Sequence, residues 1–244
     1  MEKQIIHVYK PESFGFADYL RAVVSLSDLA KNFGYKYTVA MNHPMSDFFE
    51  IDTTPYITET LSIEKILEKI RNKSTPIILE SNYTDFTIKI PKNLVQNYIR
   101  PLPELKESVQ ETLEKLKLKK QKFLIFHARN GDEGRVEEDF LRRIKLAISA
   151  LRLQRLPILF ISSSQEIKKT LSDYPGVIMT STEPCHTSQS NTERESLKNT
   201  LIEFYIMEYT KKIYSISGGS FGRGSSGFSY WASKIFSVPY SHFE

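Results

Sequence analysis

Cysteine is nearly absent from this sequence: Cys185 is the only one among 244 residues, which excludes an internal disulfide framework. Long apolar runs are absent as well, since none approaches the roughly 18 residues that a membrane-spanning helix needs. The first residues lead directly into a strand-like stretch, without an apolar signal segment or a cleavage site. We therefore expect a soluble, cytoplasmic protein with no membrane span.

Patterns for metal binding and for nucleic-acid binding are missing too. No cluster of histidine, cysteine and acidic residues has metal-ligand spacing, and no Asp-x-Asp pair lies between apolar residues. The net charge of +4 is modest, and the lysine and arginine runs have no interleaved aromatic residues. We therefore expect no metal, no cofactor and no nucleic-acid partner, and we interpret the basic runs as solvated helix faces.

What is present is an alternation of strands and helices, clearest in the second half of the chain. Short apolar runs predict strands at 123–126, 157–161, 176–179 and 213–216. Amphipathic spacing and a capping serine run predict helices at 136–151, 164–172, 192–212 and from about Ser226. This alternation predicts a parallel sheet with right-handed crossovers, which is a Rossmann-like domain.

The first half of the chain also shows alternating strand and helix patterns. The same patterns predict strands at 5–9, 37–40 and 77–79, and helices at 16–33 and 61–70, the first with Gly34 as its C-cap. The segment at 100–103 contains two prolines and interrupts the pattern before a charged helix at 104–119. We place the domain junction there and expect a cleft between two halves, with ligands beyond the carboxyl ends of the strands.

Glycine is concentrated in one place, because five of the ten glycines lie between Gly218 and Gly227. This segment follows a predicted strand and opens a predicted helix. Glycines there let backbone N–H groups approach an anion, and the helix N-terminus adds a favourable dipole. Arg223 can add a charge-assisted contact. A flexible surface loop is the alternative, but the helix that starts at once favours phosphate binding.

Polar residues also follow the strand at 123–126, in the order His127-Ala128-Arg129-Asn130-Gly131-Asp132. Alternate residues of a strand point the same way, so His127 and Arg129 can face one ligand together. The arginine fork of donors matches a diphosphate. The alternative is a surface arginine beside a histidine that is satisfied in a turn.

His-x-Arg-x-Gly-Asp after a strand resembles the motif of the GDP-fucose fucosyltransferase superfamily, which includes α1,2-, NodZ/α1,6- and protein O-fucosyltransferases. The run at 195–203 and the serine-rich loop through 229–232 continue the similarity in the same order. The resemblance implies an α/β fold with a GT-B-like pair of Rossmann-like domains. Residues 1–103 would form the acceptor-side domain, and 104–244 would bind the nucleotide sugar.

The resemblance also implies roles for single residues. Arg129 would contact the diphosphate, and His127 and Glu203 match positions that help hold the guanosine. Guanine presents two adjacent donors, N1–H and the N2 amino group, which one carboxylate can accept together, whereas adenine lacks that pair. The alternative for Glu203 is a polar residue on the exposed face of its helix. The predicted substrate-binding set is His127, Asp132, His186, Glu203, Arg223, Ser225, Ser226, Gly227, Phe228 and Ser229.

The reaction that follows is a metal-independent, inverting transfer of a sugar, with L-fucose as the first choice, from a GDP-sugar to a hydroxyl acceptor such as a carbohydrate. Arg129 would meet the charge of the leaving diphosphate. Glu137, or less favourably Asp18, would deprotonate the acceptor. Two departures from the family weaken the catalytic reading: the first turn lacks an Asn-Gln pair, and Glu133 replaces a basic residue. The alternatives are a catalytically inactive nucleotide-sugar-binding module and a transferase that uses a different nucleotide-sugar.

Overall fold

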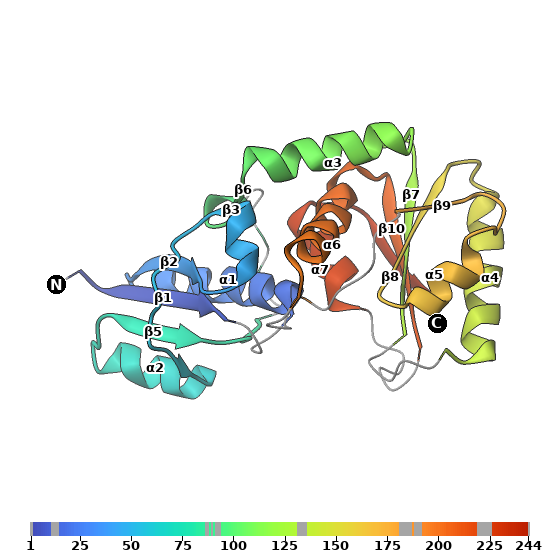
Figure 1. Cartoon of the computed structure of the whole chain (residues 1–244). Coiled ribbons are helices and arrows are strands. Elements are labelled where there is room, and N and C mark those ends of the chain that lie inside the picture. The colour runs from blue at the N-terminus through green and yellow to red at the C-terminus, as the bar shows by residue number, and fades with distance from the viewer. Residues whose placement is uncertain are drawn as a thin grey trace. The chain divides into compact units, whose positions relative to one another are not determined.

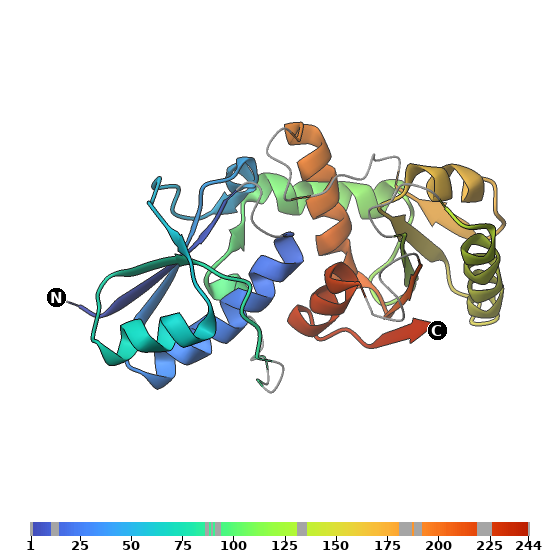
Figure 2. The same ribbon diagram turned by 90° about the horizontal axis from the view of Figure 1, so that it is seen from below.

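The computed structural model of the chain describes residues 2–10, 15–85, 88, 90, 94–130, 136–180, 187, 192–218 and 226–243. It divides into two compact units (Figures 1 and 2). The N-terminal unit comprises Met1–Pro103 and Thr187–Arg194, and the C-terminal unit comprises Glu104–His186 and Glu195–Glu244. Among the described residues, no helix is long and apolar enough to cross a membrane.

The N-terminal unit is built on a parallel sheet with the strand order β2-β1-β5-β4. Its strands are β1 (Gln4–Tyr9), β2 (Lys36–Met41), β4 (Glu59–Thr60) and β5 (Ile77–Glu80). Two α-helices accompany them, α1 (Phe16–Asn32) and α2 (Ile63–Arg71). The short strands β3 (Phe49–Glu50) and β6 (Arg100–Pro101) pair separately and antiparallel, and the 3-10 helices η1 (Pro44–Phe48) and η2 (Val95–Asn97) complete the unit.

Helix α1 ends one residue earlier than the sequence analysis expected. The C-cap is Phe33, and Gly34 follows it with φ +69°, a left-handed conformation that glycine adopts at little cost. Gly34 N donates to Lys31 O at 3.2 Å and Tyr35 N donates to Ala30 O at 2.8 Å. These two bonds form a Schellman motif, which satisfies the last carbonyls of the helix.

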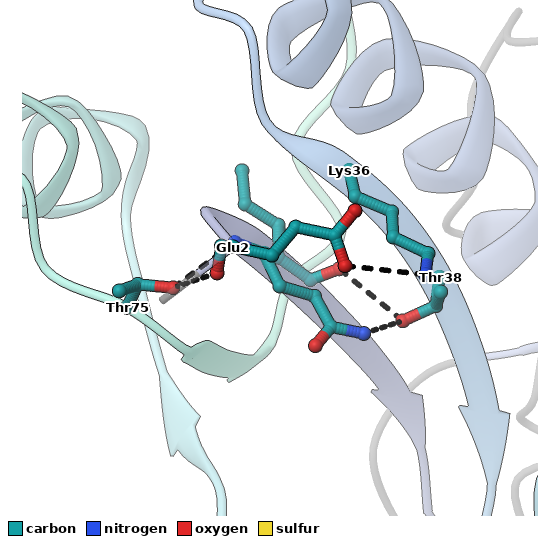
Figure 3. Close-up of polar contacts among 6 residues, drawn as sticks. Glu2, Lys36, Thr38 and Thr75 are labelled. Atoms are coloured by element: carbon teal, nitrogen blue, oxygen red, sulfur yellow. Dashed lines mark hydrogen bonds and ion pairs between the residues drawn. The ribbon is translucent and has the colours of Figure 1, made fainter.

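A small polar cluster holds the beginning of β1 (Figure 3). The Thr75 hydroxyl donates to Glu2 O at 2.9 Å and accepts from Gln4 N at 3.1 Å. On the other side, Gln4 Nε2 donates to the Thr38 hydroxyl at 3.2 Å, and Lys36 Nζ lies 3.4 Å from Glu2 Oε2. The ion pair is exposed and contributes little to stability. The cluster therefore acts mainly by fixing β1 between β2 and the segment that precedes β5.

The C-terminal unit contains a five-stranded parallel sheet with the strand order β11-β10-β7-β8-β9. The strands are β7 (Leu124–Arg129), β8 (Ile158–Ser162), β9 (Val177–Met179), β10 (Lys212–Ser217) and β11 (Tyr240–Phe243). The helices are α3 (Pro103–Lys115), α4 (Glu138–Arg152), α5 (Gln165–Leu171), α6 (Arg194–Ile206), the 3-10 turn η3 (Met207–Tyr209) and α7 (Gly227–Ile235). Figure 1 shows α4 and α5 on one face of this sheet and α6 and α7 on the other.

The core between α4, α5 and the sheet follows the predicted apolar stripe. Phe140, Ile144 and Ile148 of α4 are buried in one cluster with Phe126 and Phe160 of the central strands. Complete burial of side chains of this size stabilises the unit by about 1.5–3 kcal/mol each. This packing fixes β7 and β8 in the layer, and with them the polar residues that follow.

Two predicted helix ends in this unit are wrong, and one strand is missed. The helix predicted through Lys212 ends at Ile206, because Thr210 is extended and its hydroxyl donates to Phe123 O at 2.9 Å, so that β10 begins at Lys212. The helix predicted to reach about 119 ends at Lys115, because Lys117 adopts φ +54°. Strand β11 is not predicted by the sequence at all; its short polar–aromatic alternation forms a strand through pairing with β10.

Candidate functional site

The candidate site lies at the carboxyl edge of the five-stranded sheet, in the C-terminal unit. Because all five strands are parallel, their carboxyl ends meet at this edge. Strand β7 ends at Arg129, whose register partner is Ser217, the last residue of β10. Ala128 pairs in the same way with Ser162 of β8. Ligands of open parallel sheets bind beyond this edge, so these strand ends mark the candidate ligand site.

His127 of β7 and Ser229 of α7 form the best-defined contact of the site. Nδ1 of the buried His127 lies 3.0 Å from the Ser229 hydroxyl, although the two residues are 102 positions apart in sequence. The imidazole ring also lies 5.7 Å from the Phe228 ring, centroid to centroid, at an interplanar angle of 47°. Three of the predicted substrate-binding residues therefore lie together at the junction of β7 and α7.

The imidazole of His127 is neutral at physiological pH. Burial is the main reason why the pKa of His127 falls from 6.5 to about 3, and the nearby charges of Arg129 and Lys168 lower this pKa further. A neutral imidazole has one donor and one acceptor nitrogen. The half-buried Arg129 thus brings a positive charge near His127, which suits an anionic ligand, whereas the charge of the buried Lys168 is paired with Glu203.

The first turn of α7 supplies donors to the same edge. Ser226 is the N-cap residue, its side chain makes no capping hydrogen bond, and Tyr230 N donates to Ser226 O at 3.1 Å. The N–H groups of the first helical turn have no intrahelical partner and carry the positive end of the helix dipole. Gly227 and Phe228 lie in this turn. The loop at 219–225, with the predicted Arg223 and Ser225, lies outside the described residues.

Glu203 is buried, which overturns the alternative that it lies on an exposed helix face. It projects from α6 with 4% of its surface exposed. Lys168 Nζ of α5 lies 2.9 Å from Glu203 Oε1, and both side chains are almost completely enclosed. The Thr180 hydroxyl, just beyond β9, donates to the same carboxylate oxygen. A buried, charged acceptor is therefore held by two donors from two neighbouring segments.

Ser217, Lys168 and Thr180 join the site without having been predicted. The Ser217 hydroxyl is buried at the end of β10 and has no hydrogen-bond partner within the described part of the chain. Its place directly before the glycine-rich turn is a signal that could have found it. Lys168 and Thr180 carry no local signal, because their role depends on pairing with Glu203, 35 and 23 residues away.

Gly218, the first glycine of the glycine-rich segment, has a packing role. Its N–H donates to Arg129 O at 2.9 Å, which extends the β10–β7 pairing beyond Ser217. A Cβ atom at this position would lie 2.7 Å from Cγ of Phe140, a buried ring of α4. Since carbon atoms cannot approach so closely, this position requires glycine for the approach of β10 to α4.

Neither predicted base makes a contact with these residues among the interactions of the described residues. Glu137 is the exposed N-cap residue of α4, and its carbonyl accepts from Leu141 N at 3.1 Å. Asp18 belongs to the N-terminal unit, where it lies in the first turn of α1 and forms an ion pair with Arg21 at 3.3 Å. The predicted Asp132 and His186 lie outside the described residues. The choice of base therefore stays a prediction.

Over the described ranges of the chain, no group of three or more histidine, cysteine, aspartate or glutamate side chains is arranged to hold a metal ion. The polar groups that do converge are the Arg129 guanidinium, the His127–Ser229 pair, the start of α7 and the Lys168–Glu203 ion pair. This set can bind an anion and a hydrogen-bonding ring system side by side.

No protein-family model matches the chain, and no curated protein sequence does. Solved structures match over its whole length. NodZ α-1,6-fucosyltransferase co-crystallised with GDP superposes with a TM-score of 0.64 at 11% identity, covering 100% of this chain and 96% of that one. The selenomethionine form of NodZ from Bradyrhizobium gives 0.64 at 12% identity, with the same coverage. Arabidopsis thaliana FUT1 in complex with GDP gives 0.64 at 11% identity, covering 99% of this chain and 70% of that one.

The chain has the fold of these fucosyltransferases. The predicted α/β class, with a GT-B-like pair of Rossmann-like units, is confirmed, and the C-terminal unit contributes the larger parallel sheet. The fold thus agrees with the resemblance to fucosyltransferases that the His127–Asp132 motif indicates. Identity of 11–12% is too low to transfer an activity, so the function depends on the site itself.

Proposed function

We propose that this protein is a glycosyltransferase that moves a sugar, with L-fucose as the leading candidate, from a GDP-sugar to a hydroxyl acceptor. The observation that carries the proposal is the convergence of Arg129, the His127–Ser229 pair and the buried Glu203 at one edge of a parallel sheet. The fold adds support, because NodZ with the same fold was crystallised with GDP.

In this proposal the diphosphate lies against Arg129 and the first turn of α7. Arginine donates two parallel hydrogen bonds to phosphate oxygens, and the free N–H groups of a helix start bind the same anion. The buried Ser217 hydroxyl, beside Arg129 in register, supplies a further donor. Arg223 and Ser225 of the glycine-rich segment complete the phosphate-binding set.

The guanosine lies against Glu203 and His127, with His186 as a further contact, and Asp132 stays a predicted substrate-binding residue. An ionised carboxylate accepts from N1–H and from the N2 amino group of guanine. Adenine presents an acceptor at N1 instead, so an ionised Glu203 repels it. The neutral His127 can donate to or accept from the ribose without adding charge beside Arg129.

Transfer proceeds by attack of the acceptor oxygen on the sugar C1 as the C1–O bond to the diphosphate breaks, with inversion at C1. Glu137 or Asp18 takes the acceptor proton. GDP leaves with its new negative charge beside Arg129, which stabilises it without a metal ion. Removing one such preorganised donor typically costs about 3 kcal/mol or more of barrier.

A two-part experiment tests the proposal. Thermal unfolding with GDP, UDP or ADP should show a rise in Tm with GDP alone, because a ligand that binds only the native state stabilises it. Incubation with GDP-fucose should then release GDP, slowly by hydrolysis and faster with a carbohydrate acceptor. GDP binding without release would identify an inactive binding module, and a response to UDP alone would identify a different nucleotide-sugar.

A further inference from the structure

Lys168 is a buried lysine for which the proposed transfer has no use. Its side chain is 7% exposed, whereas lysine is almost never enclosed to this degree unless it is paired. Its partner is Glu203, whose side chain is 5% exposed. A buried ion pair is weak evidence for stability, because desolvation of both charges offsets their attraction. Stability alone therefore does not account for the buried pair.

The contacts show what the pair does to the carboxylate. Lys168 Nζ and the Thr180 hydroxyl both donate to Oε1 of Glu203. Two donors on one oxygen fix the plane of the carboxylate and favour its ionised form. Without the ammonium group, a carboxylate this deeply buried is driven towards its neutral, protonated form.

The protonation state of Glu203 decides which base it can accept. An ionised carboxylate matches the donor–donor edge of guanine, N1–H and N2–H. A protonated carboxyl group presents one donor and one acceptor, which matches the N1 acceptor and N6 amino donor of adenine. Hypoxanthine lacks the N2 amino group, so comparison of guanine with hypoxanthine measures that single contact.

The charge of Lys168 also acts on a second residue of the site, since it is one of the charges that act on the buried imidazole of His127. Within the described part of the chain, the groups around the pair include His127 and Arg129 on β7 and the Thr180 hydroxyl after β9. Lys168 thus acts on two of the residues that we assign to the guanosine, Glu203 and His127.

We propose that Lys168 is a positioning residue that keeps Glu203 ionised and oriented for guanine, and so determines the preference for guanine over hypoxanthine and adenine. The proposal rests on the proposed function, because it assumes that Glu203 faces the nucleobase. Its substrate class is a guanosine diphosphate, and its effect is on recognition of the base, separate from chemistry at the sugar.

The decisive variant is Lys168→Met, which keeps the apolar stem and removes the charge. Titration calorimetry with GDP, inosine diphosphate and ADP should show GDP affinity reduced by about tenfold or more at neutral pH, the worth of roughly one charge-assisted contact. The preference for GDP over inosine diphosphate should shrink by a similar factor. GDP affinity should recover as the pH is raised, because the carboxyl group then regains its negative charge.

Two further variants separate recognition from folding. Lys169→Met changes the exposed lysine next in α5 and should leave GDP affinity, base preference and pH profile at wild-type values. Lys168→Met combined with Glu203→Gln removes both charges, so the fold keeps no buried unpaired carboxylate. This double variant should fold as stably as Lys169→Met, yet bind GDP weakly and without the recovery at high pH.

The outcomes are distinct. Wild-type affinity, base preference and pH profile in folded Lys168→Met would overturn the proposal. If Lys168→Met does not fold, the double variant with Glu203→Gln takes its place. A wild-type preference for GDP over inosine diphosphate in that double variant would overturn the proposal equally. Absence of GDP binding by the wild-type protein would instead overturn the proposed function, and this result is recognised before any variant is made.

Discussion

His7 in the N-terminal unit and His127 in the C-terminal unit are both buried on an inner strand of a parallel sheet, β1 and β7 respectively. Burial lowers the pKa of each from 6.5 to about 3. His7 is hydrogen-bonded at both nitrogens, with Nδ1 2.9 Å from the Tyr37 hydroxyl and Nε2 3.0 Å from Ser81 O. Within the described residues, His127 is hydrogen-bonded only at Nδ1, to Ser229.

The charges near the two histidines have opposite effects on the imidazole pKa. Glu80 acts to raise the pKa of His7, so the N-terminal unit offsets part of the cost of burial. Arg129 and Lys168 act to lower the pKa of His127, so the C-terminal unit adds to it. A buried polar group that is fully satisfied holds a fold together. A buried polar group at the end of a strand, beside positive charges that lower its pKa, marks a candidate site for an anion.

The largest effect is expected from a substitution beside His127, at the candidate site. Arg129→Ala should reduce sugar transfer by roughly a hundred-fold or more, because the leaving diphosphate loses a preorganised donor. Its thermal unfolding should stay near that of the wild type, since Arg129 is only half-buried. Release of GDP from GDP-fucose measures the rate.

Arg142→Ala is the matched control, because Arg142 is an exposed arginine of α4 that pairs with Asp139 at 2.6 Å. It should transfer at the wild-type rate. Near-wild-type turnover by folded Arg129→Ala would show that the diphosphate lies elsewhere.

Acid should destabilise the protein through both histidines. Each has a native pKa of about 3, below the unfolded value of about 6.5, so the unfolded chain binds more protons between these two values. The stability is present above about pH 6.5 and is lost as the pH falls towards 3. The slope is at most about 1.4 kcal/mol per pH unit for each histidine. Urea unfolding at a series of pH values measures it.

His7→Phe sharpens that test, because it should remove one histidine's share of the slope. At neutral pH it should also cost about 1–3 kcal/mol, since the Tyr37 hydroxyl and Ser81 carbonyl lose their partner. GDP affinity should not change in the folded fraction. An undiminished acid slope in His7→Phe would mean that other groups cause it.

Two glycines extend the comparison to the backbone. Gly218→Ala should cost about 1–3 kcal/mol by overpacking, because the new methyl group would press on the Phe140 ring. Gly34→Ala should cost about 1–2 kcal/mol for a different reason, since Gly34 has φ +69° and no atom near its missing Cβ. Denaturant unfolding of each variant measures both values.

Phe140→Leu as a second substitution distinguishes the two causes. It should reduce the penalty of Gly218→Ala by opening space beside the strand, and leave the penalty of Gly34→Ala unchanged. Equal penalties of Gly218→Ala in both backgrounds would contradict the packing explanation.

The features that could be predicted from the sequence are those that depend on local residue patterns. The apolar run of β7 and the alternation of His127 with Arg129 predict a strand and a polar end, and the structure contains both. Ser164, in the predicted capping run, accepts from Ile167 N at the start of α5. Such features depend on residues a few positions apart, so one sequence suffices to find them.

The features that could not be predicted from the sequence depend on contacts between residues that are distant in sequence. Strand β11 exists through its pairing with β10, and the end of α6 depends on the bond from Thr210 to Phe123. The Lys168–Glu203 pair joins α5 to α6, and nothing near Lys168 in sequence distinguishes it from the exposed Lys169. Residue type and motif therefore suffice to propose the candidate site, whereas the buried support of Glu203 could not be predicted from the sequence.

The smallest effect is expected from Ser229→Ala, which removes only the hydroxyl at His127 Nδ1. Loss of one hydrogen bond should cost about 1 kcal/mol and weaken GDP binding by roughly fivefold, because the imidazole is less firmly oriented. Ser233→Ala removes a comparable hydroxyl one turn further along the same helix, where it donates to Tyr230 O at 2.6 Å. We expect both variants to lose a similar amount of stability, and only Ser229→Ala to lose GDP affinity. This result would establish that the β7–α7 contact serves the ligand. Equal GDP affinities in the two variants would reduce that contact to packing, and His127 would then resemble His7.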